Sequence, residues 1–138
     1  MKAPVTVDAS VFVNALSPDE EGSETSAEFI SQLKQGGAMF IQPTLFVLEV
    51  VASIARKQGD TELALEVLQE LKKIPNLTLL DLDHSFADFA SEVAANHRLR
   101  GSDAVYAAVA LRFGTELITL DKEQLERLPK VLTVKKPK

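Results

Sequence analysis

Five short apolar runs in the chain have the composition of buried β-strands. The first of them stops at Asp8, and the last precedes a basic tail. Because these runs are short and mostly rich in β-branched residues, we predict strands rather than helices. They cover Val5–Val7, Met39–Ile41, Leu77–Leu82, Leu117–Leu120 and Val131–Val134.

Between the strands, apolar residues recur every three or four positions, which predicts helices with one buried face. Glycine or proline stands at most of their ends, where these residues break a helix. The predicted helices cover Glu24–Gln35, Leu45–Lys57, residues 60 or 61 to 74, residues 83 or 85 to 99, Asp103–Phe113 and Lys122–Leu128, and a short helix or turn follows Asp8.

Three polar residues stand directly before predicted helices, where a side-chain oxygen caps free backbone N–H groups. They are Thr44, Ser102 and Asp121. Gln124 stands three residues after Asp121, which is the spacing of a capping box. We therefore expect Gln124 to cap the start of the last helix.

Strands alternate with helices along the chain, and two of the connections contain a pair of helices. Parallel strands require long crossover connections of this kind. We therefore predict an α/β fold with a mostly parallel five-stranded sheet and helices on both faces. No internal repeat or boundary divides the chain, so we expect a single domain over residues 1–138.

Composition narrows the classes of function. The net charge of −5 argues against a broad surface for nucleic-acid phosphates, unless acidic residues converge and bind a cation that reverses the local field. The chain has no cysteine, which excludes disulfides and thiolate metal sites. No apolar run reaches the ~18 residues of a membrane span. The N-terminus does not resemble a signal peptide, so we expect a cytoplasmic protein with no membrane partner.

Four acidic residues stand where the predicted topology brings them together. Asp8 and Asp121 directly follow parallel strands, while Glu49 and Asp103 lie near the starts of apolar helices. Open α/β sheets bind ligands at the edge where the carboxyl ends of the strands meet. We therefore expect the four carboxylates to form one catalytic site at this edge.

Each of these acids also has a purely structural interpretation. Asp8 would end its strand in an Asx turn, and Asp103 would interact with the dipole of its helix. Asp121 would only cap its helix, and Glu49 would be exposed or paired elsewhere. The interpretations are not exclusive, because a capping carboxylate keeps a second oxygen free.

Four neighbouring carboxylates repel one another, and a hard divalent cation such as Mg²⁺ or Mn²⁺ relieves this repulsion. His84 and His97 lie too far apart in sequence to suggest a zinc site. A divalent cation can activate water and stabilise the leaving oxygen of a phosphodiester. Ser10, Asn14 and Thr119 are candidate supporting residues, although caps and turns explain them equally well.

Four segments of the chain resemble the motifs of PIN domains, and more closely those of single-domain VapC-type toxins from bacterial and archaeal toxin–antitoxin pairs. They are VDASVFVNAL with Asp8, the helix that carries Glu49, RLRGSDAVYAAVA with Asp103, and LITLDKE with Asp121. The resemblance covers essentially the whole chain. It departs around Thr119–Lys122, where many relatives carry an asparagine or a second acid, so Asp121 is the least secure of the four.

The resemblance implies a metal-dependent endoribonuclease with a Rossmann-like α/β/α fold and Mg²⁺ or Mn²⁺ as cofactor. Its implied partners are an RNA substrate such as tRNA or rRNA, a second copy in a homodimer, and a VapB-type antitoxin whose C-terminal segment occupies the active-site groove. The implied catalytic and metal-binding residues are Asp8, Glu49, Asp103 and Asp121, with Asp8 and Asp103 nearest the first metal and with Ser10, Thr119 and Asn14 in support.

For the antitoxin, the resemblance places a groove over the helix of Glu49 and the region Asp19–Phe29. Apolar stripes on helices usually face the core, so we expect most apolar residues there to be buried. They are Phe29, Ile30, Leu33, Phe46, Val47 and Val50. Candidate cations for substrate phosphates are Arg56, Lys57, Arg98, Arg100 and Lys122.

Two other functions suit a similar fold. A catalytically silent PIN scaffold would bind RNA or a protein partner. Such a scaffold would lack one or two of the four acids, whereas all four are present in this chain. A receiver domain or haloacid-dehalogenase-like phosphatase needs a second carboxylate close to the first aspartate, whereas Ala9 and Ser10 follow Asp8. We therefore predict a nuclease.

Overall fold

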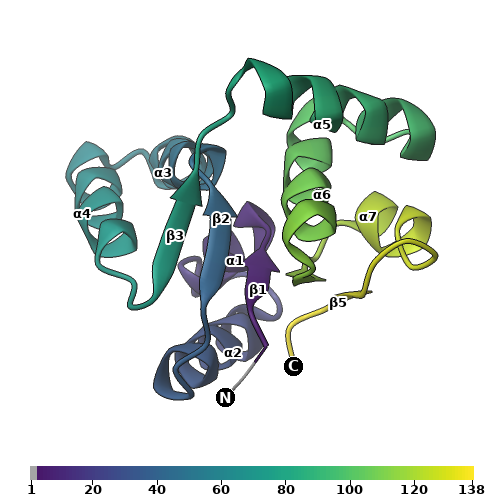
Figure 1. Cartoon of the computed structure of the whole chain (residues 1–138). Coiled ribbons are helices and arrows are strands. Elements are labelled where there is room, and N and C mark those ends of the chain that lie inside the picture. Colours follow the sequence, from purple (N-terminus) through teal and green to yellow (C-terminus); the bar gives the residue numbers. More distant parts are fainter. Residues whose placement is uncertain (1–2) are drawn as a thin grey trace.

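Five parallel strands form one sheet in the order β3-β2-β1-β4-β5 (Figure 1). The structure is a computed structural model that describes residues 3–138. The strands are β1 (Val5–Val7), β2 (Phe40–Pro43), β3 (Leu77–Leu80), β4 (Glu116–Ile118) and β5 (Val134–Lys135).

Helices fill every connection between successive strands, as parallel pairing requires. They are α1 (Ala9–Ala15), α2 (Ser23–Gln35), α3 (Leu45–Gln58), α4 (Thr61–Lys72), α5 (His84–His97), α6 (Gly101–Phe113) and α7 (Lys122–Arg127). The predicted fold class and the predicted helices are confirmed, with ends that mostly agree within two residues.

The chain winds over the sheet in two directions. From β1 through β2 to β3 it moves outward, with α1 packed against α2 and α3, and α3 against α4. It then returns through α5 and α6 to β4, beside β1 (Figure 1). Right-handed crossovers place these two groups of helices on opposite faces. The winding reverses between β1 and β4, and a crevice opens at such a point beyond the carboxyl ends of the strands.

The burial of α6 explains its apolar sequence. This helix packs against α5 on one side and against β1, β2 and β4 on another. All residues from Asp103 to Ala110 are buried, so the helix has no polar face in this stretch. A helix that is apolar all round is typical of a position in the core. Asp103 is therefore a carboxylate carried on a core helix.

Side chains, rather than backbone, join β1 to β2 near the crevice. Backbone pairing between them is confined to one register pair, Val5 with Phe40. Beyond it, the amide of Gln42 accepts from the N–H of Val7 at 2.6 Å and donates to the Val7 carbonyl at 2.7 Å. The hydroxyl of Thr6 donates to the carbonyl of Ile41 at 2.8 Å. The residue before Asp8 is thus held by a fully buried glutamine.

Two predicted helix caps are wrong. Thr44 has helical backbone angles and its side chain makes no capping hydrogen bond. Its N–H instead donates to Leu80, because the chain turns directly from the sheet into α3. Helix α6 begins one residue before Ser102, with Arg100 at the cap position and no side-chain cap.

Four predicted strands have shifted ends, and those of β2 and β4 move by one or two residues. β3 stops at Leu80, because Asp81 and Leu82 have left the sheet and are exposed. The fifth strand begins only at Val134. The N–H groups of Val131 and Leu132 donate to the carbonyl of Leu128, so this stretch completes the turn after α7 before the chain joins the sheet. Within residues 3–138, no helix combines the length and the apolar character needed to cross a membrane.

Candidate acidic site

Three of the four predicted acids line one pocket of about 350 Å³ at the carboxyl edge of the sheet. Asp8 comes from the end of β1, Glu49 from α3 and Asp103 from the first turn of α6. We call this hollow the acidic pocket. Asp121 does not line it, although its charge acts on Asp103.

Asp8 is 6% exposed and caps α1. Its Oδ2 accepts from the N–H of Ser10 at 2.9 Å, and its Oδ1 accepts from Nε2 of Gln124 at 3.5 Å. Burial raises the pKa of Asp8, and the charge of Glu49 raises it further, against the effect of these hydrogen bonds. The Asx turn predicted at Asp8 is confirmed, and each carboxylate oxygen still has a free lone pair.

Glu49 is half-buried between α3 and α6. The hydroxyl of Tyr106 donates to its Oε1 at 2.7 Å. Tyr106 is fully buried, so this contact fixes the position of the carboxylate from beneath. Burial raises the pKa of Glu49, and the charge of Asp103 adds to the effect. Glu49 is therefore not a solvated surface acid, and it forms no ion pair with any of the residues from 3 to 138.

Asp103 and Asp121 share one cation. The guanidinium of Arg100 donates from Nε to Asp103 Oδ2 at 3.2 Å and from Nη2 to Asp121 Oδ1 at 3.1 Å. Even so, burial and the charges of Asp121 and Asp8 raise the pKa of Asp103 to about 6. Arg100, which was predicted as a contact for substrate phosphates, lies against these two acids.

Asp121 also caps α7, because its Oδ2 accepts from the backbone N–H of Gln124 at 2.9 Å. The other bond of the predicted capping box, from the N–H of Asp121 to the Gln124 side chain, is absent from the hydrogen bonds among residues 3–138. The N–H of Asp121 donates to the hydroxyl of Thr119 at 3.0 Å, so it does not need the Gln124 side chain. That side chain points inward and is fully buried.

The predicted supporting residues bond partly to backbone groups and partly to side chains around the site. The hydroxyl of Ser10 accepts from the N–H of Leu120 at 3.1 Å and joins α1 to the end of β4. Asn14 lines the acidic pocket, but its side chain bonds to Glu20, Glu21 and Ser26 around the loop before α2. Thr119 is fully buried beneath Asp121.

Comparison with protein families matches residues 5–131 to the PIN domain model. The chain belongs to the PIN domain family. No curated protein has a significantly similar sequence.

Solved structures with the same fold as this PIN domain are distant in sequence. A DNA-bound VapBC from Salmonella typhimurium has a TM-score of 0.70 at 15% identity, with 98% of each chain covered. VapC20 of Mycobacterium tuberculosis, a toxin that cleaves the sarcin–ricin loop, has a TM-score of 0.69 at 15% identity, covering 86% of this chain and 90% of that one. PAE2754 from Pyrobaculum aerophilum has a TM-score of 0.69 at 20% identity, covering 96% and 83%. These likenesses show the shared fold.

The donor chemistry of the acidic pocket fits a hard divalent cation. Its ionisable ligands are carboxylates only, and their raised pKa values reflect burial and mutual repulsion that a cation would relieve. The acids are spread along the pocket, however. Among residues 3–138, no three acidic or histidine side chains lie close enough together to form a ready-made metal site.

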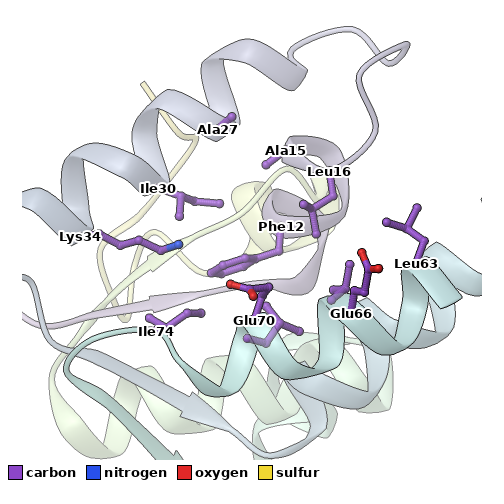
Figure 2. A pocket seen from close by; sticks show the side chains of 12 residues that line it. Phe12, Ala15, Leu16, Ala27, Ile30, Lys34, Leu63, Glu66, Glu70 and Ile74 are labelled. Carbon is purple, nitrogen blue, oxygen red and sulfur yellow. The ribbon is translucent and has the colours of Figure 1, made fainter.

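A second hollow of this PIN domain, of about 390 Å³, lies between α2, α4 and the end of α1 (Figure 2). We call it the apolar groove. Its walls are mostly apolar, including Phe12, Ile30 and Leu63, while Lys34 and Glu66 stand at its edge. None of the four candidate acids lines it. The predicted groove residues Phe29, Ile30, Leu33, Phe46 and Val50 are buried in the core, and Val47 is packed partly buried against it.

Three residues with contacts in the site had no catalytic role in the sequence analysis. Tyr106 is the one polar side chain in the apolar stretch of residues 104–111. A polar group in such a stretch predicts a buried hydrogen bond. Gln124 was predicted to bond to the start of its own helix, and Arg100 was predicted only as a contact for substrate phosphates. Of the other cation candidates, Lys57 lines the acidic pocket and pairs with Glu20 at 2.7 Å.

Proposed function

We propose that this PIN domain is a metal-dependent endoribonuclease, with Mg²⁺ or Mn²⁺ held by Asp8, Glu49 and Asp103 and completed by Asp121. One observation carries the proposal: three carboxylates from separate elements share one pocket, and the pKa of each is raised. Buried like charges without full compensation destabilise a fold, so their retention is typical of a functional site.

The chain's own residues would prepare the site as follows. Tyr106 holds Glu49 in place, and the Ser10 N–H and Gln124 amide orient Asp8. Lys57 lies at the pocket, where its ammonium can meet a phosphate of the RNA. A bound divalent cation would supply charge stabilisation to the phosphodiester during hydrolysis.

We further propose that the protein is the toxin of a VapBC-type pair, that it acts in the cytoplasm and that it forms a homodimer. Support comes from the solved structures that share its fold, which include a VapBC2 complex from Rickettsia felis and a toxin–antitoxin complex from Klebsiella pneumoniae. A segment of the antitoxin would occupy the apolar groove, which lies over α2 and α4 rather than over the Glu49 helix where the resemblance puts it. One of its basic side chains would enter the acidic pocket. Added Mg²⁺ should then weaken the complex; an affinity that stays constant through a metal titration would contradict this arrangement.

The test of the nuclease is cleavage of a structured RNA pool by the antitoxin-free protein in Mg²⁺ or Mn²⁺. Asp8→Asn and EDTA serve as parallel controls. Cleavage by the wild type that both controls abolish is the expected result. A folded wild-type protein that cuts no RNA at any metal concentration would overturn the nuclease and favour a scaffold that binds RNA or a protein. Pools that contain tRNA or rRNA would narrow the target.

A further inference from the structure

Gln124 makes an unusual set of contacts for a residue in the first turn of a short helix. It is fully buried, and its side chain passes beneath α7 toward the crevice between β1 and β4. Its Nε2 donates to the carbonyl of Asp103 at 3.2 Å and to Oδ1 of Asp8 at 3.5 Å. Its Oε1 accepts from the hydroxyl of Thr119 at 2.5 Å.

These partners fix the orientation of the side-chain amide. Both groups near Nε2 can only accept a hydrogen bond when Asp8 is ionised, so the NH₂ end must face them. The Thr119 hydroxyl accepts from the N–H of Asp121 and is left to donate to Oε1. The amide therefore has one satisfied arrangement and no equivalent flipped one.

The backbone of the same residue reaches a third acid. The N–H of Gln124 donates to Oδ2 of Asp121 at 2.9 Å. One residue thus contacts the Asp8 carboxylate, the Asp121 carboxylate and the peptide carbonyl of Asp103. These acids come from three different elements of the fold, so no local segment of chain could set their relative positions.

We propose that Gln124 is a positioning residue that aligns Asp8 and Asp103 for the divalent cation. This inference rests on the proposed function, because it concerns the residues that would hold the metal. Partners that orient metal ligands without touching the metal typically change metal affinity by about 10- to 100-fold when they are removed. Gln124 acts through hydrogen bonds to the ligand residues. We therefore expect the loss of its side-chain amide to lower the affinity for the metal.

Two substitutions separate positioning from simple packing. Gln124→Met keeps the volume of the side chain but removes its hydrogen bonds. Gln124→Glu keeps the contact with Thr119 but turns an oxygen toward Asp8 and the Asp103 carbonyl, which should repel both. The matched control is Thr115→Val, which removes a buried 2.6 Å hydrogen bond to Thr6 just before β4, at the opposite edge of the sheet.

The experiment is a Mn²⁺ titration of each full-length protein, followed by the shift in melting temperature and by the electron paramagnetic resonance of free Mn²⁺. Without metal, Gln124→Met and Thr115→Val should both melt below the wild type. Only Gln124→Met should raise the apparent Kd for Mn²⁺, by about 10-fold or more. Its RNA cleavage should recover toward the wild-type rate at high Mn²⁺, which a packing defect would not produce.

A folded Gln124→Met that binds Mn²⁺ as tightly as the wild type would overturn the inference and leave the proposed function intact. A wild type that binds no Mn²⁺ would overturn both. If Gln124→Met does not fold, Thr119→Val replaces it, because this change frees the amide to rotate. A weaker affinity for Mn²⁺ in Thr119→Val then supports the inference, and an unchanged affinity overturns it.

Discussion

The acidic pocket and the apolar groove have similar volumes, about 350 and 390 Å³, and opposite chemistry. The groove is lined by side chains that continue into the core, such as Phe12, whose ring lies 5.0 Å from that of Phe46. The pocket holds Asp8, Glu49 and Asp103, each with a raised pKa. The apolar groove destabilises the fold little, whereas the carboxylates of the acidic pocket repel one another, and a bound cation would relieve this repulsion.

The comparison teaches that size alone does not identify a catalytic site. Both hollows lie beside α1, and both are large enough for part of a ligand. Only the acidic pocket gathers ionisable groups whose protonation the fold itself disturbs, which is the physical signature of a reactive site. The apolar groove instead matches the requirements of a surface for an apolar peptide segment.

The largest expected contrast lies in catalysis. Asp103→Asn should lower RNA cleavage more than about 100-fold, because it removes a charged ligand from the pocket. Leu63→Lys, placed in the apolar groove, should leave the cleavage rate of the isolated protein within about twofold and weaken antitoxin binding. Single-turnover cleavage assays and a pull-down with the antitoxin measure the two effects. Equal loss of cleavage in both variants would erase the functional distinction between the hollows.

Metal binding should stabilise the protein through the acidic pocket. At about 100 times its Kd, a cation that binds only the folded state adds about 2.7 kcal/mol to the free energy of unfolding. Calorimetry with and without Mn²⁺ should therefore show a rise in melting temperature that EDTA reverses. The rise should persist in Leu63→Lys and vanish in the Asp8→Asn, Asp103→Asn double variant. A rise that survives in the double variant would place the metal elsewhere.

Without metal, Asp103→Asn should stabilise the protein at neutral pH. The pKa of Asp103 is about 6 in the fold, against an ordinary value of 3.8, so the folded state holds this proton more tightly. Its contribution to stability is complete below about pH 3.8 and is lost as the pH rises through about 6. An asparagine at this position does not titrate and has no such loss, so the variant should gain about 1–2 kcal/mol at pH 8 and nothing at pH 4.

Urea unfolding in EDTA at both pH values measures this gain. A wild type that is the more stable protein at pH 8 would mean that Arg100 fully compensates the buried charge. Arg100→Gln is then the informative control, because it removes a cation that touches both Asp103 and Asp121.

The smallest effect concerns the entrance to the acidic pocket. Lys57→Met breaks the ion pair with Glu20, but both side chains are more than a third exposed. The free energy of unfolding should therefore fall by no more than about 0.5 kcal/mol. If Lys57 contacts RNA phosphates, KM should rise while kcat changes little. Steady-state kinetics at low and high salt separates these outcomes, and an unchanged KM would remove Lys57 from the substrate site.

The sequence was sufficient for the fold because its signals are local and agree with one another. Apolar runs that end at Asp8 or Pro43, and helices closed by glycine at Gly59 and Gly114, all indicate the same alternation of elements. The edge strand β5 was placed too early, because residues 131–132 continue the turn of Leu128 and only then enter the sheet. These hydrogen bonds to the Leu128 carbonyl join backbone groups, so the sequence of side chains gives no sign of them.

The candidate site was only partly predictable. Topology alone brings Asp8, Glu49 and Asp103 to one edge, and the structure places all three in one pocket. The contacts of Gln124 depend on how far its side chain reaches into the core, which residue spacing cannot reveal. The same spacing fits a capping box and a buried link to Asp8, and only the position of the Thr119 hydroxyl decides between them.

The side-chain pairing between β1 and β2 has a consequence for how such a protein can change. In an ordinary sheet the separation of two strands is set by the backbone, and no single substitution alters it. Here the side-chain amide of Gln42 supplies both bonds to Val7, the residue before Asp8. The spacing of β1 and β2 at that end of the sheet therefore depends on one replaceable side chain. A substitution of Gln42 can change this spacing, and with it the shape of the acidic pocket, while the register of every strand stays as it is.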